Sequence, residues 1–239
     1  MGTATQAAAT WGDLPECLRQ SIIGHLGVSG AVLPSMVDTA MRDSVARVRQ
    51  LRHTHYQRGR RHEEAQSYAR AVEAYRRAAE LGSSYALCNL GYCHEHGLGV
   101  ERDLTRALTL YSESAEDGNS DAQCNAGYLH EVGMGVARDL AAAARLYAAA
   151  AEQGNGRAQF NLGLCYLSGK GVERDEELAI AWLTRAAHQG RLKAQLTLAC
   201  LYSHAGPNRS ANPPRAVWWC RKAAEGGHAP IGATRLGIG

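Results

Sequence analysis

The residue types best suited to chemistry gather in one short run, Cys93-His94-Glu95-His96, and His130 lies 36 residues beyond His94. Thiolate and imidazole groups are the ligands that zinc prefers, and a zinc site needs three or four ligands converging within about 2.0–2.3 Å. Adjacent side chains on one helix point apart, so this run is a poor metal cage. No Ser-His-Asp order, Walker loop or paired-carboxylate spacing stands out. We therefore expect no enzymatic activity, no cofactor and no metal. A metal- or redox-linked assembly factor remains an alternative.

The elements that position these residues follow a fixed period of 36 residues. Such a period is typical of stacked repeats, each of which buries its apolar face against its neighbours. Recurring glycines predict where helices end, and a recurring aspartate is placed to cap the next helix. We expect helix pairs over 84–96/104–117, 120–132/140–153 and 156–168/176–189. The recurring positions are Ala86/Ala122/Ala158/Ala194, Gly91/Gly127/Gly163, Gly97/Gly133/Gly169, Gly99/Gly135/Gly171, Val100/Val136/Val172, Asp103/Asp139/Asp175 and Ala107/Ala143/Ala179.

The repeated pattern A-x(3)-L-G-x(2)-Y-x(2)-G-x-G-V-x(2)-D-x(3)-A, followed by A-A-x(2)-G, resembles the Sel-1-like repeat, a relative of the tetratricopeptide repeat. The run from Ala158 to Asp175 matches it almost completely, and the resemblance covers roughly three quarters of the chain. It implies an all-α fold, a right-handed α-solenoid of antiparallel helix pairs. It also implies a scaffold or adaptor that binds a partner protein or peptide in its concave groove. Two departures are His94 and His130, which stand where the family has a tyrosine.

The resemblance also implies which residues line the groove. In tetratricopeptide-like arrays the exposed groove positions of each first helix lie two before the Leu-Gly pair, one after it and four after it. Each triplet shares one helix face, so we expect an apolar floor edged by carboxylates. Such a floor suits a peptide with apolar anchors and some Lys or Arg. The alternative is that these side chains pack between neighbouring helices. The expected groove residues are Cys88, Tyr92, Glu95, Cys124, Tyr128, Glu131, Phe160, Leu164 and Leu167.

The amino-terminal segment allows two interpretations. Its pattern L-P-x(2)-L-x(3)-I-x(3)-L, carried by Leu14, Pro15, Leu18, Ile22 and Leu26, resembles the opening of an F-box. An F-box implies docking on a Skp-type adaptor and a role as substrate receptor of a cullin-based ubiquitin ligase. No tryptophan stands near residue 45, where the F-box usually ends. The alternative is an amphipathic helix that caps the exposed apolar edge of the first repeat.

The expected domain organisation has five parts: a disordered stretch over 1–12, the F-box-like or capping segment over 13–46, an irregular leading repeat over 47–83, the regular repeats over 84–230 and a tail over 231–239. In the leading repeat, Tyr56 and Gly59 resemble the family's Y-x(2)-G, which predicts a turn two residues longer than elsewhere. The arginine-rich stretch 41–61 contains Val45, Val48 and Leu51. We expect these three to form a buried stripe beneath a solvated basic face rather than a nucleic-acid site.

Composition sets the remaining expectations. The 26 Lys and Arg residues nearly balance the 23 Asp and Glu residues, so strong attraction to nucleic acid or to membranes is not expected. No apolar run approaches the length of a membrane span, and the first residues lack the features of a signal peptide. Cysteines at equivalent repeat positions indicate small core or groove residues with reduced thiols. We therefore expect a protein partner, no membrane insertion and a cytoplasmic, or alternatively nuclear, location.

Overall fold

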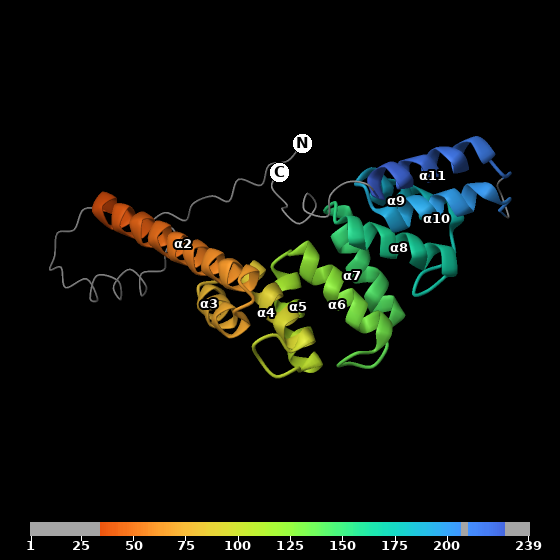
Figure 1. The fold of residues 1–239 in the computed structure, drawn as a ribbon. Helices are drawn as coiled ribbons and strands as arrows, with labels where there is room; N and C mark the ends of the chain where they lie inside the picture. The colour runs from red at the N-terminus through yellow and green to blue at the C-terminus, as the bar shows by residue number, and fades with distance from the viewer. Residues whose placement is uncertain (1–33, 207–209, 228–239) are drawn as a thin grey trace.

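The computed structural model describes residues 34–206 and 210–227, with side chains from Met41 onward. The F-box-like residues, the stretch 1–12 and the tail 231–239 lie outside these ranges. Ten helices form in the described ranges and follow one another along a curved row, from α2 at one end to α11 at the other (Figure 1). None of these helices is long and apolar enough to cross a bilayer.

The helices pair into five repeats. The first helices of the pairs are α2 (Pro34–Glu64), α4 (Ser84–His96), α6 (Ser120–Val132), α8 (Gly156–Ser168) and α10 (Leu192–Ser203). The second helices are α3 (Tyr68–Glu80), α5 (Leu104–Glu116), α7 (Leu140–Glu152), α9 (Glu176–His188) and α11 (Pro213–Gly227). Each helix contacts its partner and the adjoining helix of the next repeat, which makes the fold an α-solenoid. The three helix pairs predicted from the 36-residue period are confirmed, to within one residue at each end.

Glycine and aspartate set the helix ends as the period predicts. Gly97 ends α4 in the left-handed region with φ 68°, and its N–H donates to the carbonyl of Cys93. Asp103 then caps α5, because its carboxylate accepts the backbone N–H of Arg106 at 2.9 Å. Gly135, with φ 74°, has a second role, since a Cβ there would lie 2.6 Å from the carbonyl carbon and oxygen of Leu104. Each turn therefore packs directly on the start of the preceding repeat's second helix.

A three-residue set holds the two helices of a repeat together. Gly91 lets the ring of Tyr111 lie against α4, since a Cβ at Gly91 would meet that ring at 2.8 Å. The hydroxyl of Tyr111 then donates to the carboxylate of Glu95 at 2.7 Å. We call this the glycine–tyrosine–glutamate set. The first and third repeats contain the same set, as Gly59–Tyr75–Glu63 and Gly127–Tyr147–Glu131. In the fourth repeat leucines replace both the tyrosine and the glutamate, giving Gly163–Leu183–Leu167.

The leading repeat differs from the sequence prediction. Gly59 packs on the ring of Tyr75, as Gly91 packs on Tyr111, so Gly59 corresponds to the glycine of the Leu-Gly pair and not to a turn glycine. Residues 65–67 alone link α2 to α3, whereas residues 97–103 link α4 to α5. The leading turn is thus four residues shorter than the next one, and the prediction of two extra residues was wrong. Gln66 within it has φ 55°.

The amino-terminal half of α2 extends beyond the repeats (Figure 1). Helix α2 has 31 residues, whereas its partner α3 has 13 and covers only the carboxyl-terminal part of α2. Val45, Val48 and Leu51 are consequently exposed at 50%, 43% and 45%, so the prediction of a buried stripe was wrong. The helix also runs continuously across position 46/47, where we expected a boundary between two parts of the chain.

Candidate functional site

An exposed apolar row runs along the first helices. Tyr92, Tyr128 and Leu164 occupy the same position of α4, α6 and α8 and are exposed at 40%, 43% and 38%. Half-buried Asn89, Asn125 and Asn161 precede them by three residues, so each amide lies on the same side of its helix. We call these six residues the first-helix face. It presents one apolar side chain and one amide per repeat, at a regular interval.

The polar groups of this face are linked between repeats. The amide of Asn125 donates to Cys88 Sγ at 3.9 Å, and its oxygen accepts from the Arg157 guanidinium at 2.7 Å. Asn155 donates to the carboxylate of Asp121 at 2.9 Å. These contacts join α4, α6 and α8 side by side, so the amide of Asn125 is held in position by the packing of one repeat on the next.

The structure places three of the nine expected groove residues on the exposed row and the others elsewhere. Cys88 and Cys124 are buried, because their position faces the first helix of the next repeat. Phe160 and Leu167 are half-buried and pack against the core formed by the fourth and fifth repeats. The expectation of exposure was therefore wrong for the two cysteines, and the exposed side of each helix is rotated toward the asparagines.

The two carboxylates expected to edge the groove are less accessible than predicted. Glu95 and Glu131 are half-buried, and their carboxylates accept the hydroxyls of Tyr111 and Tyr147 at 2.7 and 2.9 Å. Burial together with these carboxylates raises the pKa of both tyrosines above its ordinary value. The two glutamates thus stabilise the contact between the helices of a repeat and offer less charge to a partner than a free edge would.

The run from Cys93 to His96 does not converge on one point. Cys93 lies in the core, Glu95 binds Tyr111, and the ring of His96 lies on Tyr92 with centroids 4.2 Å apart. Among the described residues, no group of three or more Cys, His, Asp or Glu side chains could hold a metal ion. Burial raises the pKa of Cys93 to about 11 and that of Cys88 to about 12. These thiols stay protonated at neutral pH, which disfavours redox or metal chemistry at them.

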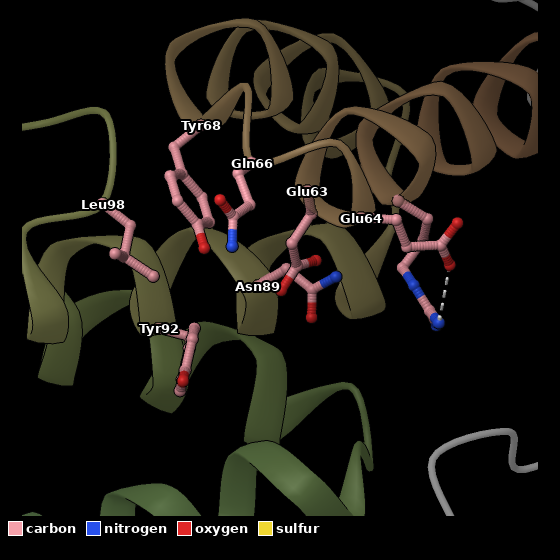
Figure 2. Close-up of a pocket in the computed structure, with 8 residues that line it drawn as sticks. Glu63, Glu64, Gln66, Tyr68, Asn89, Tyr92 and Leu98 are labelled. Atoms are coloured by element: carbon pink, nitrogen blue, oxygen red, sulfur yellow. Dashed lines mark ion pairs between the residues drawn. The ribbon is translucent and has the colours of Figure 1, made fainter. Parts of the chain in front are cut away.

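Two charged features of the structure were not predicted from the sequence. A cavity of about 770 Å³ lies between the α2–α3 link and α4, with Glu63, Glu64 and Tyr68 among its lining residues (Figure 2). At the other end of the array, burial and the neighbouring Arg157 lower the pKa of Arg191. The second feature leaves a sequence signal in two series of equivalent positions, since Tyr85 and Asp121 are followed by Arg157 and Lys193, and Asn119 and Asn155 are followed by Arg191. The cavity leaves none, because its lining residues come from α2, the link, α3 and α4 and meet only in the folded chain.

Comparison with known proteins identifies the repeat. The Sel1 repeat family matches residues 55–83, 84–119, 120–155, 156–190 and 192–228, which together cover most of the chain. The chain belongs to the Sel1 repeat family. Its five matched Sel1 repeats correspond to the five helix pairs, and the first match begins within α2, leaving the projecting half of that helix outside the repeats.

Two solved structures illustrate the Sel1 similarity. A Sel1 repeat protein from Oxalobacter formigenes is 30% identical with a TM-score of 0.68, over 74% of this chain and 73% of that one. The protein c5321, a protective antigen of uropathogenic Escherichia coli with an SLR fold, is 33% identical with a TM-score of 0.62. The match to c5321 covers 67% of this chain and 34% of c5321, so this chain spans about a third of that protein's length.

Proposed function

We propose that this Sel1 repeat chain is a non-enzymatic scaffold that binds an extended segment of a partner protein along the first-helix face. The observation that carries the proposal is the exposure of Tyr92, Tyr128 and Leu164 at one position of three successive repeats. Large apolar side chains aligned on one surface are typical of protein interaction sites, where aromatic residues contribute much of the binding energy.

The amides suggest the form of the partner. An extended peptide exposes backbone N–H and C=O groups at regular intervals, and an asparagine side chain can both donate and accept a hydrogen bond. Asn89, Asn125 and Asn161 place one such amide per repeat beside the apolar row, and at Asn125 a second N–H and a second lone pair of the oxygen are left beyond the contacts with Cys88 and Arg157. We therefore propose that the amides bind the partner's backbone and that the apolar row binds its apolar side chains.

The test replaces both tyrosines of the row, in the variant Tyr92→Ala/Tyr128→Ala. Truncating two exposed aromatic side chains at an interface is expected to weaken partner binding by about 2 kcal/mol or more, roughly thirtyfold. Partners are recovered by affinity purification with the wild-type chain, identified by mass spectrometry, and measured again with the variant. Because both rings are well exposed, the melting temperature is expected to change little.

The matched control is Leu178→Ala. Leu178 lies on α9, a second helix, and is exposed at 44%, close to the exposure of the two tyrosines. The Leu178→Ala variant should bind each partner with the same affinity as the wild type. Equal binding by the tyrosine variant and the wild type would contradict the proposal. So would a collapse of the tyrosine variant's melting temperature without selective loss of binding, since the rings would then belong to the core.

One experiment separates the two interpretations of residues 13–26, which lie outside the described ranges. If the segment is an F-box, Leu14→Ala/Pro15→Ala should abolish binding of a purified Skp-type adaptor and leave the circular dichroism unchanged. If it is a cap, the exposed Val45, Val48 and Leu51 on α2 are a surface that it could cover. The same change should then lower stability, and no adaptor should bind. Adaptor binding undiminished by the double change excludes the F-box.

A further inference from the structure

The cavity at the α2–α3 link is lined by residues of α2, of the link itself, of the start of α3 and of α4. Glu63, Gln66 and Tyr68 reach toward Asn89 of α4 across it, and Tyr92 lies at its margin (Figure 2). Asn89 and Tyr92 belong to the first-helix face, so the cavity lies at the amino-terminal end of that face. A partner segment lying along the face would reach it.

The cavity lies beside the short α2–α3 link. In the next repeat, the turn 97–103 packs on the preceding second helix, and a Cβ at Gly99 would lie 2.4 Å from backbone atoms of Tyr68 and Ala69. The leading repeat has only residues 65–67 at this place and so lacks four residues of such a turn. Gln66 of this short link and Tyr68 at the start of α3 both line the cavity.

The walls of the cavity favour a cation. Glu63 and Glu64 are adjacent, whereas the equivalent positions hold Glu95 and His96 in the second repeat and Glu131 and Val132 in the third. Glu63 accepts the Tyr75 hydroxyl, which engages one of its two carboxylate oxygens. Arg60 contributes one opposing charge. It is 3.7 Å from Glu64 in an exposed ion pair, and a hydrogen bond to Tyr56 raises its pKa.

The aromatic residues add a second preference. The rings of Tyr68 and Tyr92 border the same space as the two carboxylates. A planar guanidinium can stack on such rings while it donates to carboxylate and amide oxygens, which an ammonium group does less well. We infer that this cavity binds a basic side chain of the partner segment, arginine in preference to lysine, at the amino-terminal end of the first-helix face. The inference rests on the proposed function for the source of that side chain.

The opposite end of the face has the opposite charge. Arg157, Arg191 and Lys193 lie at the starts of α8 and α10, where the positive end of each helix dipole adds to their charge, and Asp121 is an acidic neighbour of Arg191. A basic residue of the partner is therefore attracted to the α2–α4 end and repelled from the α8–α10 end. This difference gives the bound segment one direction along the array.

The experiment uses a single-residue probe, so it does not depend on the whole face. Nα-acetylarginine amide is titrated into the isotope-labelled full chain, and binding is followed by NMR through the side-chain amide signals of Gln66 and Asn89. Nα-acetylcitrulline amide, which has nearly the same shape without the charge, is the matched ligand. We expect the arginine compound to bind in the millimolar range and the citrulline compound to bind about tenfold more weakly.

The variant Glu64→Gln removes one carboxylate that the fold does not need and should weaken arginine binding about threefold to fivefold. Glu173→Gln makes the same charge change on an exposed turn far along the chain and should bind as the wild type does. Equal affinity for the arginine and citrulline compounds, or equal affinity of the Glu64→Gln variant and the wild type, would overturn the inference. Unchanged partner binding by Tyr92→Ala/Tyr128→Ala would overturn the groove proposal, whereas the cavity is tested separately by titrating the arginine compound into the wild-type chain, so the two failures are distinguishable.

Discussion

Replacing Gly135 by alanine tests the contact that joins one repeat to the next. The change places a Cβ on a residue with φ 74°, where left-handed backbone costs an L-residue about 1–2 kcal/mol. The same Cβ would lie 2.6 Å from the backbone of Leu104. Forcing one extra carbon into such a close contact costs about 1–3 kcal/mol more. We expect the free energy of unfolding to fall by about 2–5 kcal/mol in total.

Gly118→Ala is the matched control. Gly118 has φ 82°, and a Cβ there would meet nothing within 4 Å. This variant should lose only about 1–2 kcal/mol, from the backbone conformation. The lower entropy of an unfolded chain with alanine in place of glycine is the same in both variants and cancels.

The measurement is urea unfolding of both variants followed by far-UV circular dichroism, with midpoint and slope fitted separately. We expect Gly135→Ala to lose more free energy of unfolding than Gly118→Ala. The dependence of that free energy on urea concentration should change little, because the substitution perturbs a contact between repeats and not the extent of the folded structure. Equal losses for the two variants would refute the reasoning, since the turn would then not pack on the preceding repeat.

Three further predictions follow from the buried polar groups. Tyr147→Phe removes the hydrogen bond to Glu131 and should lower stability by about 0.5–1.5 kcal/mol in urea unfolding, and an unchanged midpoint would contradict the pairing. The pKa values of Tyr75, Tyr111 and Tyr147 are raised in the folded chain, so their contribution to stability is fully present below pH about 10 and falls above it, by up to about 1.4 kcal/mol per pH unit for each tyrosine. Tyr147→Phe should show a shallower alkaline loss than the wild type, and equal slopes would exclude this origin. A thiol reagent followed by peptide mass spectrometry should modify the exposed Cys200 and Cys220 in the native chain and the buried Cys88 only after unfolding, whereas early modification of Cys88 would contradict its burial.

The sequence predicts the repeats well because their signals are local. A left-handed glycine ends a helix and an aspartate caps the next one whatever the distant surroundings are, so the three regular helix pairs follow from the 36-residue period. In the leading repeat these local signals are ambiguous. Gly59 is compatible both with a turn and with the helix interior beneath a tyrosine ring, and only the packing of Tyr75 distinguishes the two.

The binding surface is less predictable than the helices. The period shows which residues are equivalent, and it places Tyr92, Tyr128 and Leu164 in one exposed row. The side of a helix that the next repeat covers depends on the angle between repeats, which the sequence pattern does not contain. Cys88 and Cys124 therefore lie inside although they share a helix face with the tyrosines. The cavity beside Gln66 is lined by residues of three helices and a link, and these residues are brought together only by the packing of α4 on the leading repeat.

The packing of each turn on the preceding second helix has a consequence for the length of the molecule. Gly99, Gly135 and Gly171 meet Tyr68, Leu104 and Leu140 in the same way, so the joint between neighbours is the same at three successive places. Inserting or deleting a unit of 36 residues in the regular region would recreate this glycine contact on both sides of the change, although side-chain contacts such as that of Asn155 with Asp121 are particular to one joint. The array can thus be lengthened or shortened by duplication or loss of whole units. Each added unit would extend the first-helix face by one apolar side chain and one amide, and would move the charged ends apart by one fixed step.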